Sequence, residues 1–204
     1  MFARVAAVWA LLLSVLLWAA PAAAQPFQPE GPYTHLPSGL VFPESLGGMR
    51  RVMAIDYERQ SPGLGVSVKY VMESGGMFAD VYVYNQGHAR IATGITDPLV
   101  QGMVEAAIGD ILAVARSGRY ADLKPTGRQV VTLGKAAGAP QALVASFSYV
   151  LTGAEVYSQV YGLGAHNHFV KVRVTYPQEQ ALQSMAVLGA FLEELGTVVG
   201  SNAH

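Results

Sequence analysis

Between residues 51 and 176, the apolar side chains of this chain recur mainly at every second position, in short segments bounded by turn residues. In the clearest segment, apolar residues at 66, 68, 70 and 72 alternate with polar ones such as Ser67 and Lys69. A period of two is typical of a β-strand with one buried and one exposed face. The pattern therefore restricts the chain to folds that cover one side of several strands.

The alternating segments fall into two runs. The first run predicts strands at 51–57, 66–72 and 79–84, and Met53, Ile55 and Tyr57 share one face of the first of them. Turn sequences separate the three strands, and the links are too short for a crossover helix. We therefore expect an antiparallel meander.

A helix is predicted after the first run. Asp97 is a good N-cap, Pro98 suits the first helical position, and Gly118 is a plausible C-terminal stop. The apolar residues between them recur at helical spacing. They are Val100, Met103, Ala107, Ile111 and Val114.

The second run predicts four strands, at 130–133, 143–149, 156–163 and 170–176. Pro177 then opens a closing helix that Gly196 is expected to end. Its expected apolar stripe consists of Leu182, Met185, Leu188, Leu192 and Leu195.

Strands grouped in runs indicate an α+β protein. We expect a mostly antiparallel sheet of about six or seven strands, in the order βββ-α-ββββ-α, with two helices packed on it. The expected division is a signal peptide at 1–24, a proline-rich lead segment at 25–48, a single α+β domain at 49–198 and a flexible tail at 199–204. Within the lead, Leu40–Phe42 is expected to be a short edge strand and 25–34 to be flexible or extended.

The first 24 residues have the pattern of a secretory signal. A charged start that ends at Arg4 precedes an apolar run from Val5 to Ala20, and Pro21 and three alanines follow. Cleavage would leave Gln25 as the first residue. The prediction is a periplasmic or secreted protein, and the alternative is an inner-membrane protein anchored by an uncleaved N-terminal helix.

Composition narrows the classes of partner. The chain contains no cysteine, so it can form neither a disulfide nor a lipoprotein anchor. Its net charge is −1, which becomes −2 once Arg4 leaves with the signal. This balance argues against nucleic acid as a partner. After the signal no apolar run is long enough to span a membrane.

Several segments resemble the PsbP-like fold, an α/β/α sandwich around an antiparallel sheet. They are the opening Leu36-Pro-Ser-Gly-Leu-Val-Phe-Pro43, the strand ending Asp56-Tyr57, the segment 63–70, and Val81-Tyr-Val-Tyr84 before a helix. Proteins of this fold are mostly partner-binding or assembly subunits, so the resemblance implies such a role. It transfers no catalytic residues.

The pair His166 and His168 is the best candidate for a metal site. Two histidines two positions apart point the same way in a strand, which can suit zinc or copper. His166 falls in a predicted turn, however, and nothing in the sequence links it to further histidines such as His88 and His35. Solvent-exposed turn histidines are the commoner case, so no metal or other cofactor is expected.

Enzyme motifs are missing from the sequence. It has no Gly-x-Ser-x-Gly elbow and no Ser-x-x-Lys run, and its glycine pairs lack the helix and lysine of a phosphate loop. The carboxylates Asp80, Glu105 and Asp110 are dispersed. A hydrolase site assembled from scattered residues remains an alternative.

Polar and aromatic residues occupy the side of the strands opposite the aliphatic ones. If the strands pair in one sheet, these residues could form a mixed charged and tyrosine-rich face, of a kind favoured in binding interfaces. The candidate partner-binding residues are Lys69, Asp80, Tyr82, Tyr84, Lys171 and Arg173. The alternative is a face that is merely solvated or covered by the second helix.

The preferred prediction is an exported, non-enzymatic module that binds an envelope protein or a small ligand through the sheet face or a helix–sheet cleft. The alternatives are an envelope hydrolase without a recognisable motif and a periplasmic metal-binding protein that uses His166 and His168.

Overall fold

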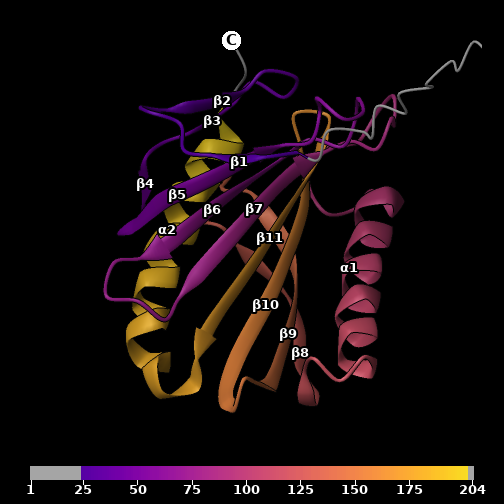
Figure 1. Cartoon of the computed structure of the whole chain (residues 1–204). Helices are drawn as coiled ribbons and strands as arrows, with labels where there is room; N and C mark the ends of the chain where they lie inside the picture. Colours follow the sequence, from indigo (N-terminus) through magenta and orange to yellow (C-terminus); the bar gives the residue numbers. More distant parts are fainter. Residues whose placement is uncertain (1–23, 202–204) are drawn as a thin grey trace, which may run out of the picture.

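The computed structural model describes residues 24–201, which form an antiparallel sheet with one helix on each face (Figure 1). Within these residues the sheet has nine strands, in the order β1-β5-β6-β7-β11-β10-β9-β8, with β4 paired to β5. The predicted α+β class and the order βββ-α-ββββ-α are confirmed. The strand number exceeds six or seven because the lead segment adds β1 and β4. Residues 1–23 of the predicted signal peptide (1–24) and residues 202–204 of the predicted tail (199–204) lie outside the described residues.

The two predicted runs correspond to the main strands. The first run consists of β5 (Met49–Asp56), β6 (Val66–Met72) and β7 (Phe78–Tyr84), and α1 (Pro98–Arg116) follows it. The second run consists of β8 (Ala121–Thr132), β9 (Gln141–Leu151), β10 (Ala154–Ala165) and β11 (His168–Pro177). A short 3-10 turn (Gln178–Gln180) then leads into α2 (Ala181–Gly200).

The two runs join where β7 pairs with β11. This pairing is antiparallel and places Asp80 opposite Arg173 and Tyr82 opposite Lys171. Strands from the beginning and the end of the chain therefore lie side by side in the middle of the sheet. Residues that are far apart in the sequence meet there.

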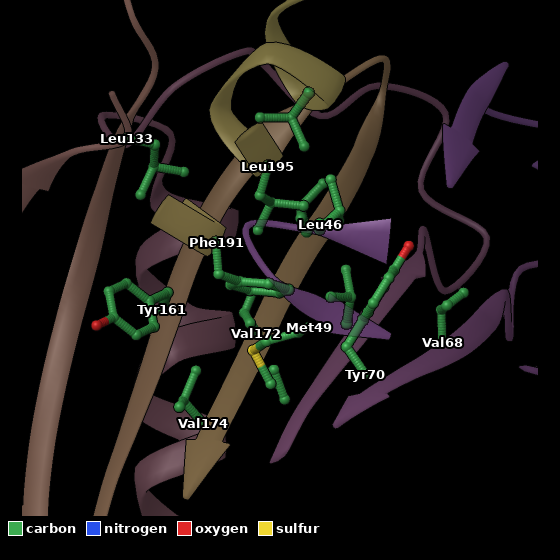
Figure 2. Packing of buried hydrophobic residues seen from close by; sticks show 14 of the residues in the cluster. Leu46, Met49, Val68, Tyr70, Leu133, Tyr161, Val172, Val174, Phe191 and Leu195 are labelled. Carbon is green, nitrogen blue, oxygen red and sulfur yellow. The ribbon is translucent and has the colours of Figure 1, made fainter. Parts of the chain in front are cut away.

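The helices cover opposite faces of the sheet. Phe191 and Leu195 of α2 pack among buried side chains of the strands, including Tyr70, Val172 and Val174 (Figure 2). On the other face, α1 packs on the strands β8 to β11, and Val100, Met103, Ala107 and Ile111 are buried as expected. The N-cap also agrees with the sequence, because an Asp97 carboxylate oxygen accepts from Leu99 N at 2.9 Å.

The expected apolar stripe of α2 is partly wrong. Leu182 and Met185 are 90% and 60% exposed. The buried face instead consists of Ser184, Leu188, Phe191, Leu195, Gly196 and Val199. Both sides of this helix carry apolar residues, so periodicity alone left its rotation ambiguous, and packing against the sheet decides it.

Gly196 does not end α2, which continues to Gly200. A Cβ at Gly196 would lie 1.9 Å from the carbonyl oxygen of Leu133. This glycine therefore allows the helix to pass close to the backbone after β8. The helix also takes in Val199 and Gly200, which were expected to belong to the tail.

The lead segment is more ordered than its prolines suggest. Strand β1 (Pro26–Phe27) pairs with β5, as does β4 (Ser45–Leu46). The predicted strand 40–42 is confirmed as β3 (Leu40–Phe42), which pairs with β2 (Tyr33–His35) in a separate two-stranded sheet. Leu40 and Phe42 are buried, so this strand belongs to the core.

Arg51 fixes the lead segment to the sheet. Its side chain is buried, and its guanidinium donates to the carbonyl oxygens of Phe42, Pro29 and Gly31. A β-bulge between Arg51 and Met53 changes the phase of β5. As a result Met53 and Ile55 share a face, as predicted, but this face is the one opposite α2.

Strand β8 is much longer than the predicted 130–133. The sequence pattern missed most of it because most of its residues are exposed. An edge strand without a buried face has no alternating pattern to detect. Two bulges interrupt the strand, one between Ala121 and Lys124 and one between Pro125 and Gly127. Together with the proline at 125, they limit edge-to-edge pairing with another chain.

By length and composition, α1 and the segment Gln178–Gly200 could each cross a membrane. Each of them packs one side against the sheet, as core helices do.

Candidate functional site

The six candidate residues lie on one face of the sheet. In the register of the strands, Lys69 of β6 pairs with Asp80 of β7, which pairs with Arg173 of β11. In the same way Ser67 pairs with Tyr82, which pairs with Lys171. Paired residues of an antiparallel sheet point to the same side. We call the surface formed by Lys69, Asp80, Tyr82, Tyr84, Lys171 and Arg173 the open face.

The open face is on the side of the sheet that carries α1, not α2. The residues that alternate with it in β7 and β11, such as Val81 and Val172, are buried under α2. The second helix, α2, lies on the opposite face and therefore does not cover the tyrosines. The first helix, α1, packs on β8 to β11 and lies beside them. The six side chains are half-buried.

Lys69 and Asp80 neutralise each other. Lys69 Nζ lies 3.4 Å from Asp80 Oδ1, and it also lies 4.4 Å from the centre of the Phe78 ring. Burial raises the pKa of the Asp80 carboxyl, and the Lys69 ammonium opposes that shift. This pair is a closed ionic contact and leaves little charge free for a ligand.

Arg173 also makes its contacts within the protein, through three hydrogen bonds. Its guanidinium donates to the Tyr120 hydroxyl at 3.0 Å and the Tyr149 hydroxyl at 3.3 Å, and its Nε donates to Ser158 Oγ at 3.4 Å. The rings of Tyr120 and Tyr149 stack with centroids 4.2 Å apart. The sequence did not single out this tyrosine pair, because Tyr120 follows α1 and Tyr149 lies on another strand.

Lys171 differs from both. Its ammonium lies 4.6 Å from the centre of the Tyr82 ring and 5.6 Å from that of Tyr84. Among residues 24–201, the ion pairs within 4 Å include none to Lys171. Burial lowers the pKa of this amine, while Asp110 acts in the opposite direction. Lys171 is therefore a partly desolvated cation that lies over aromatic faces and forms no ion pair within 4 Å among the described residues.

A cleft of about 470 Å³ lies between α1 and the strands β7 and β11. Tyr82, Tyr84, Phe169 and Lys171 line it from the sheet. The α1 side contributes Leu99, Gly102, Met103 and Asp110, and the neighbouring loops contribute Leu64 and His88. Three of the six predicted residues thus border the cleft, and Lys69, Asp80 and Arg173 are not among its lining residues.

The electrostatics of the cleft are simple. Burial raises the pKa of Tyr82 to about 12 and that of Tyr84 to about 12, so both phenols remain neutral hydrogen-bonding groups. Asp110 is exposed on α1, as a solvated carboxylate would be. Its position at the cleft depends on how α1 lies on the sheet, which sequence patterns did not reveal.

His166 and His168 are separated in the structure. His168 is buried, and its Nδ1 lies 2.7 Å from the carbonyl oxygen of His166, whose side chain lies in the β10–β11 turn. The His168 ring instead meets that of His35 edge to face, with centroids 5.4 Å apart. In the part of the chain that the structure describes, no three His, Cys, Asp or Glu residues are grouped so that they could hold a metal ion.

One serine and one histidine are hydrogen-bonded, as hydrolase chemistry requires. Ser38 Oγ lies 2.8 Å from His35 Nδ1. Both residues are buried, at 5% and 3% exposure, and Ser38 Oγ also accepts from Leu40 N at 3.2 Å. This pair closes the β2–β3 turn, where a substrate could not reach it.

Comparison with protein-family models gave no match, and no curated protein matches the chain. Among solved structures, the chain is similar to cyanobacterial PsbP (CyanoP) from Synechocystis sp. PCC 6803, known from a solution structure. The two share 12% sequence identity over 87% of this chain and 96% of that one, with a TM-score of 0.43. The PsbP-like resemblance noted in the sequence thus has a counterpart in the structure, as a likeness of fold.

Proposed function

We propose that this chain is an exported, non-enzymatic module that binds a small ligand in the cleft between α1 and the strands β7 and β11. The observation that carries the proposal is the ammonium of Lys171, which borders a cleft of about 470 Å³ and has no carboxylate within 4 Å among the described residues. Ligand pockets in proteins have volumes of roughly 300–1,000 Å³, so the cleft has a suitable size.

The surroundings of Lys171 support binding rather than chemistry. The other two cations of the open face are already engaged within the protein, since Lys69 contacts Asp80 and Arg173 donates hydrogen bonds to two phenols. The buried pair of His35 and Ser38 is part of a turn. What remains for an incoming molecule is one cation, neutral phenols and apolar walls, which can hold a ligand in place.

The export part of the proposal depends on the signal pattern of the first 24 residues. N-terminal sequencing of the protein from its own host tests it, with Gln25 expected as the first residue. A chain that retains Met1 and is found in the cytosol would contradict export, while Met1 retained in the inner membrane would support the anchored alternative.

Two glycines of α1 allow the cleft to be tested without damage to the core. A Cβ at Gly102, which lines the cleft, or at Gly109, which does not, would meet no heavy atom within 4 Å. Gly102→Trp should therefore fill the cleft, and Gly109→Trp is the matched control on the same helix.

The test is native mass spectrometry of protein purified from the host envelope. A bound small molecule should accompany the wild type and Gly109→Trp and be absent from Gly102→Trp. If all three proteins carry the same bound small molecule, or if none of them carries one, the proposal is wrong. A pull-down in which Gly109→Trp and Gly102→Trp both retain an envelope protein would support the protein-binding alternative instead.

A further inference from the structure

We propose that the α1–sheet cleft selects a monocarboxylate with an apolar body. The carboxylate would contact Lys171, and the apolar part would lie between α1 and the sheet. This inference rests on the proposed function and specifies the chemistry of its ligand.

The first argument is the unmet hydrogen-bonding capacity of Lys171. An ammonium has three N–H donors and no acceptor. The aromatic faces of Tyr82 and Tyr84 attract the charge, but they accept no strong hydrogen bond. Lys69 is the internal comparison, because it lies over Phe78 in the same way and also reaches the carboxylate of Asp80 at 3.4 Å. The position that Asp80 fills for Lys69 has no counterpart at Lys171 among the described residues.

The second argument limits the ligand to one negative charge. The cleft offers one free cation, while Asp110 on the α1 side brings a negative charge close enough to influence the pKa of Lys171 and of Tyr84. The nearest other cation on β11, Arg173, is held by Tyr120, Tyr149 and Ser158. A dianion such as a phosphate monoester would therefore be repelled by Asp110 without a second cation to compensate.

The third argument concerns the rest of the ligand. Leu64, Leu99, Met103 and Phe169 supply apolar walls around the charged end of the cleft. Leu64 and Leu99 are 47% and 37% exposed. Covering them would remove apolar surface from water and favour a ligand with an aromatic or aliphatic body.

Three probes with a common ring separate these effects by calorimetric titration of the mature protein. They are phenylacetate, its neutral analogue phenylacetamide and the dianion phenyl phosphate. Phenylacetate should bind at least about tenfold more tightly than phenylacetamide, which is the difference expected for one charge-assisted hydrogen bond. Phenyl phosphate should bind more weakly than phenylacetate.

Two variants assign the effect to residues. Lys171→Met keeps the length of the side chain and removes its charge, so phenylacetate should bind about tenfold more weakly while phenylacetamide is unaffected. Lys135→Met is the control, because that lysine is exposed and pairs with Glu193 at 3.1 Å on the other side of the molecule. Asp110→Asn should tighten the binding of phenyl phosphate, a gain that misfolding could not produce.

The inference is overturned if phenylacetamide binds as well as phenylacetate, if phenyl phosphate binds best to the wild type, if no probe binds, or if Lys171→Met leaves phenylacetate unaffected. These outcomes do not touch the proposed function, which fails separately when Gly102→Trp protein from the host still carries the native ligand.

Discussion

Lys171 lies directly opposite Tyr82 in the β7–β11 pairing, and its ammonium is 4.6 Å from the centre of the Tyr82 ring. The contact joins the last strand of the chain to the third strand of its first run. It places the Lys171 ammonium, for which the described residues supply neither an ion pair nor a hydrogen-bond acceptor, at the edge of α1. The cleft beside it is consequently the part of this surface best suited to hold another molecule.

Gly189 and Gly196 of α2 should respond to substitution by alanine in opposite ways. At Gly189 the new methyl group meets nothing within 4 Å, so higher helix propensity should raise the free energy of unfolding by roughly 0.5–1 kcal/mol. At Gly196 it would lie 1.9 Å from Leu133 O, so overpacking should lower that free energy by roughly 1–3 kcal/mol. Urea unfolding measures both. Equal effects would show that α2 does not pass close to Leu133.

Acid should weaken the fold through His35. Burial, with a smaller contribution from His168, lowers its pKa from 6.5 to about 4, against the opposing effects of Glu58 and Asp56. The unfolded chain then binds this proton more readily, so stability is complete above about pH 6.5 and falls between there and about pH 4. At about 1.4 kcal/mol per pKa unit, the loss should reach about 3 kcal/mol.

Unfolding measured between pH 7.5 and 4.5 checks this prediction. His35→Leu should show a flatter pH dependence than the wild type. The slope is the readout, because the variant also loses the contact with Ser38. Parallel curves for the two proteins would exclude His35 as the titrating group.

Removing the guanidinium of Arg51 should release the lead segment. Arg51→Met leaves the carbonyl oxygens of Phe42, Pro29 and Gly31 without their donor. The expected loss of stability is about 2–3 kcal/mol, since the buried Phe42 carbonyl costs about 1–3 kcal/mol when unsatisfied and the partly buried carbonyls of Pro29 and Gly31 add less. Limited proteolysis should then cut within residues 25–34 sooner than in the wild type.

The neighbouring Arg50 is exposed, so Arg50→Met is the matched control and should be cut at the wild-type rate. Identical cleavage of the two variants would mean that Arg51 does not hold the lead segment.

The sequence predicted the elements whose two sides differ. In strand β6 and helix α1 one side is apolar and buried and the other is more polar and less buried, so periodicity placed them and named their core residues. It failed at β8, which is exposed on most of its length, and at α2, where Leu182 and Met185 lie on the solvent side. Neither element has a contrast between faces that a periodic pattern could detect.

The candidate site was predictable only as a set of residues on one face. Alternation placed Tyr82 and Lys171 opposite the aliphatic side of their strands, and pairing of β7 with β11 then brought them together. That Asp110 and Met103 would face them depends on the packing of α1 over β10, where a Cβ at Gly162 would lie 2.3 Å from Val104 Cγ2. This approach of helix and strand is a tertiary feature without a local signal.

The central claim is that the α1–sheet cleft is the binding site of this protein. Amide chemical shifts of the labelled mature protein, titrated with the small-molecule fraction of its host envelope, test it most directly. We expect the largest shifts at Tyr82, Gly102, Phe169 and Lys171, and their loss in Gly102→Trp. Shifts centred on the β8 edge or on the exposed side of α2, or none at all, would contradict the claim.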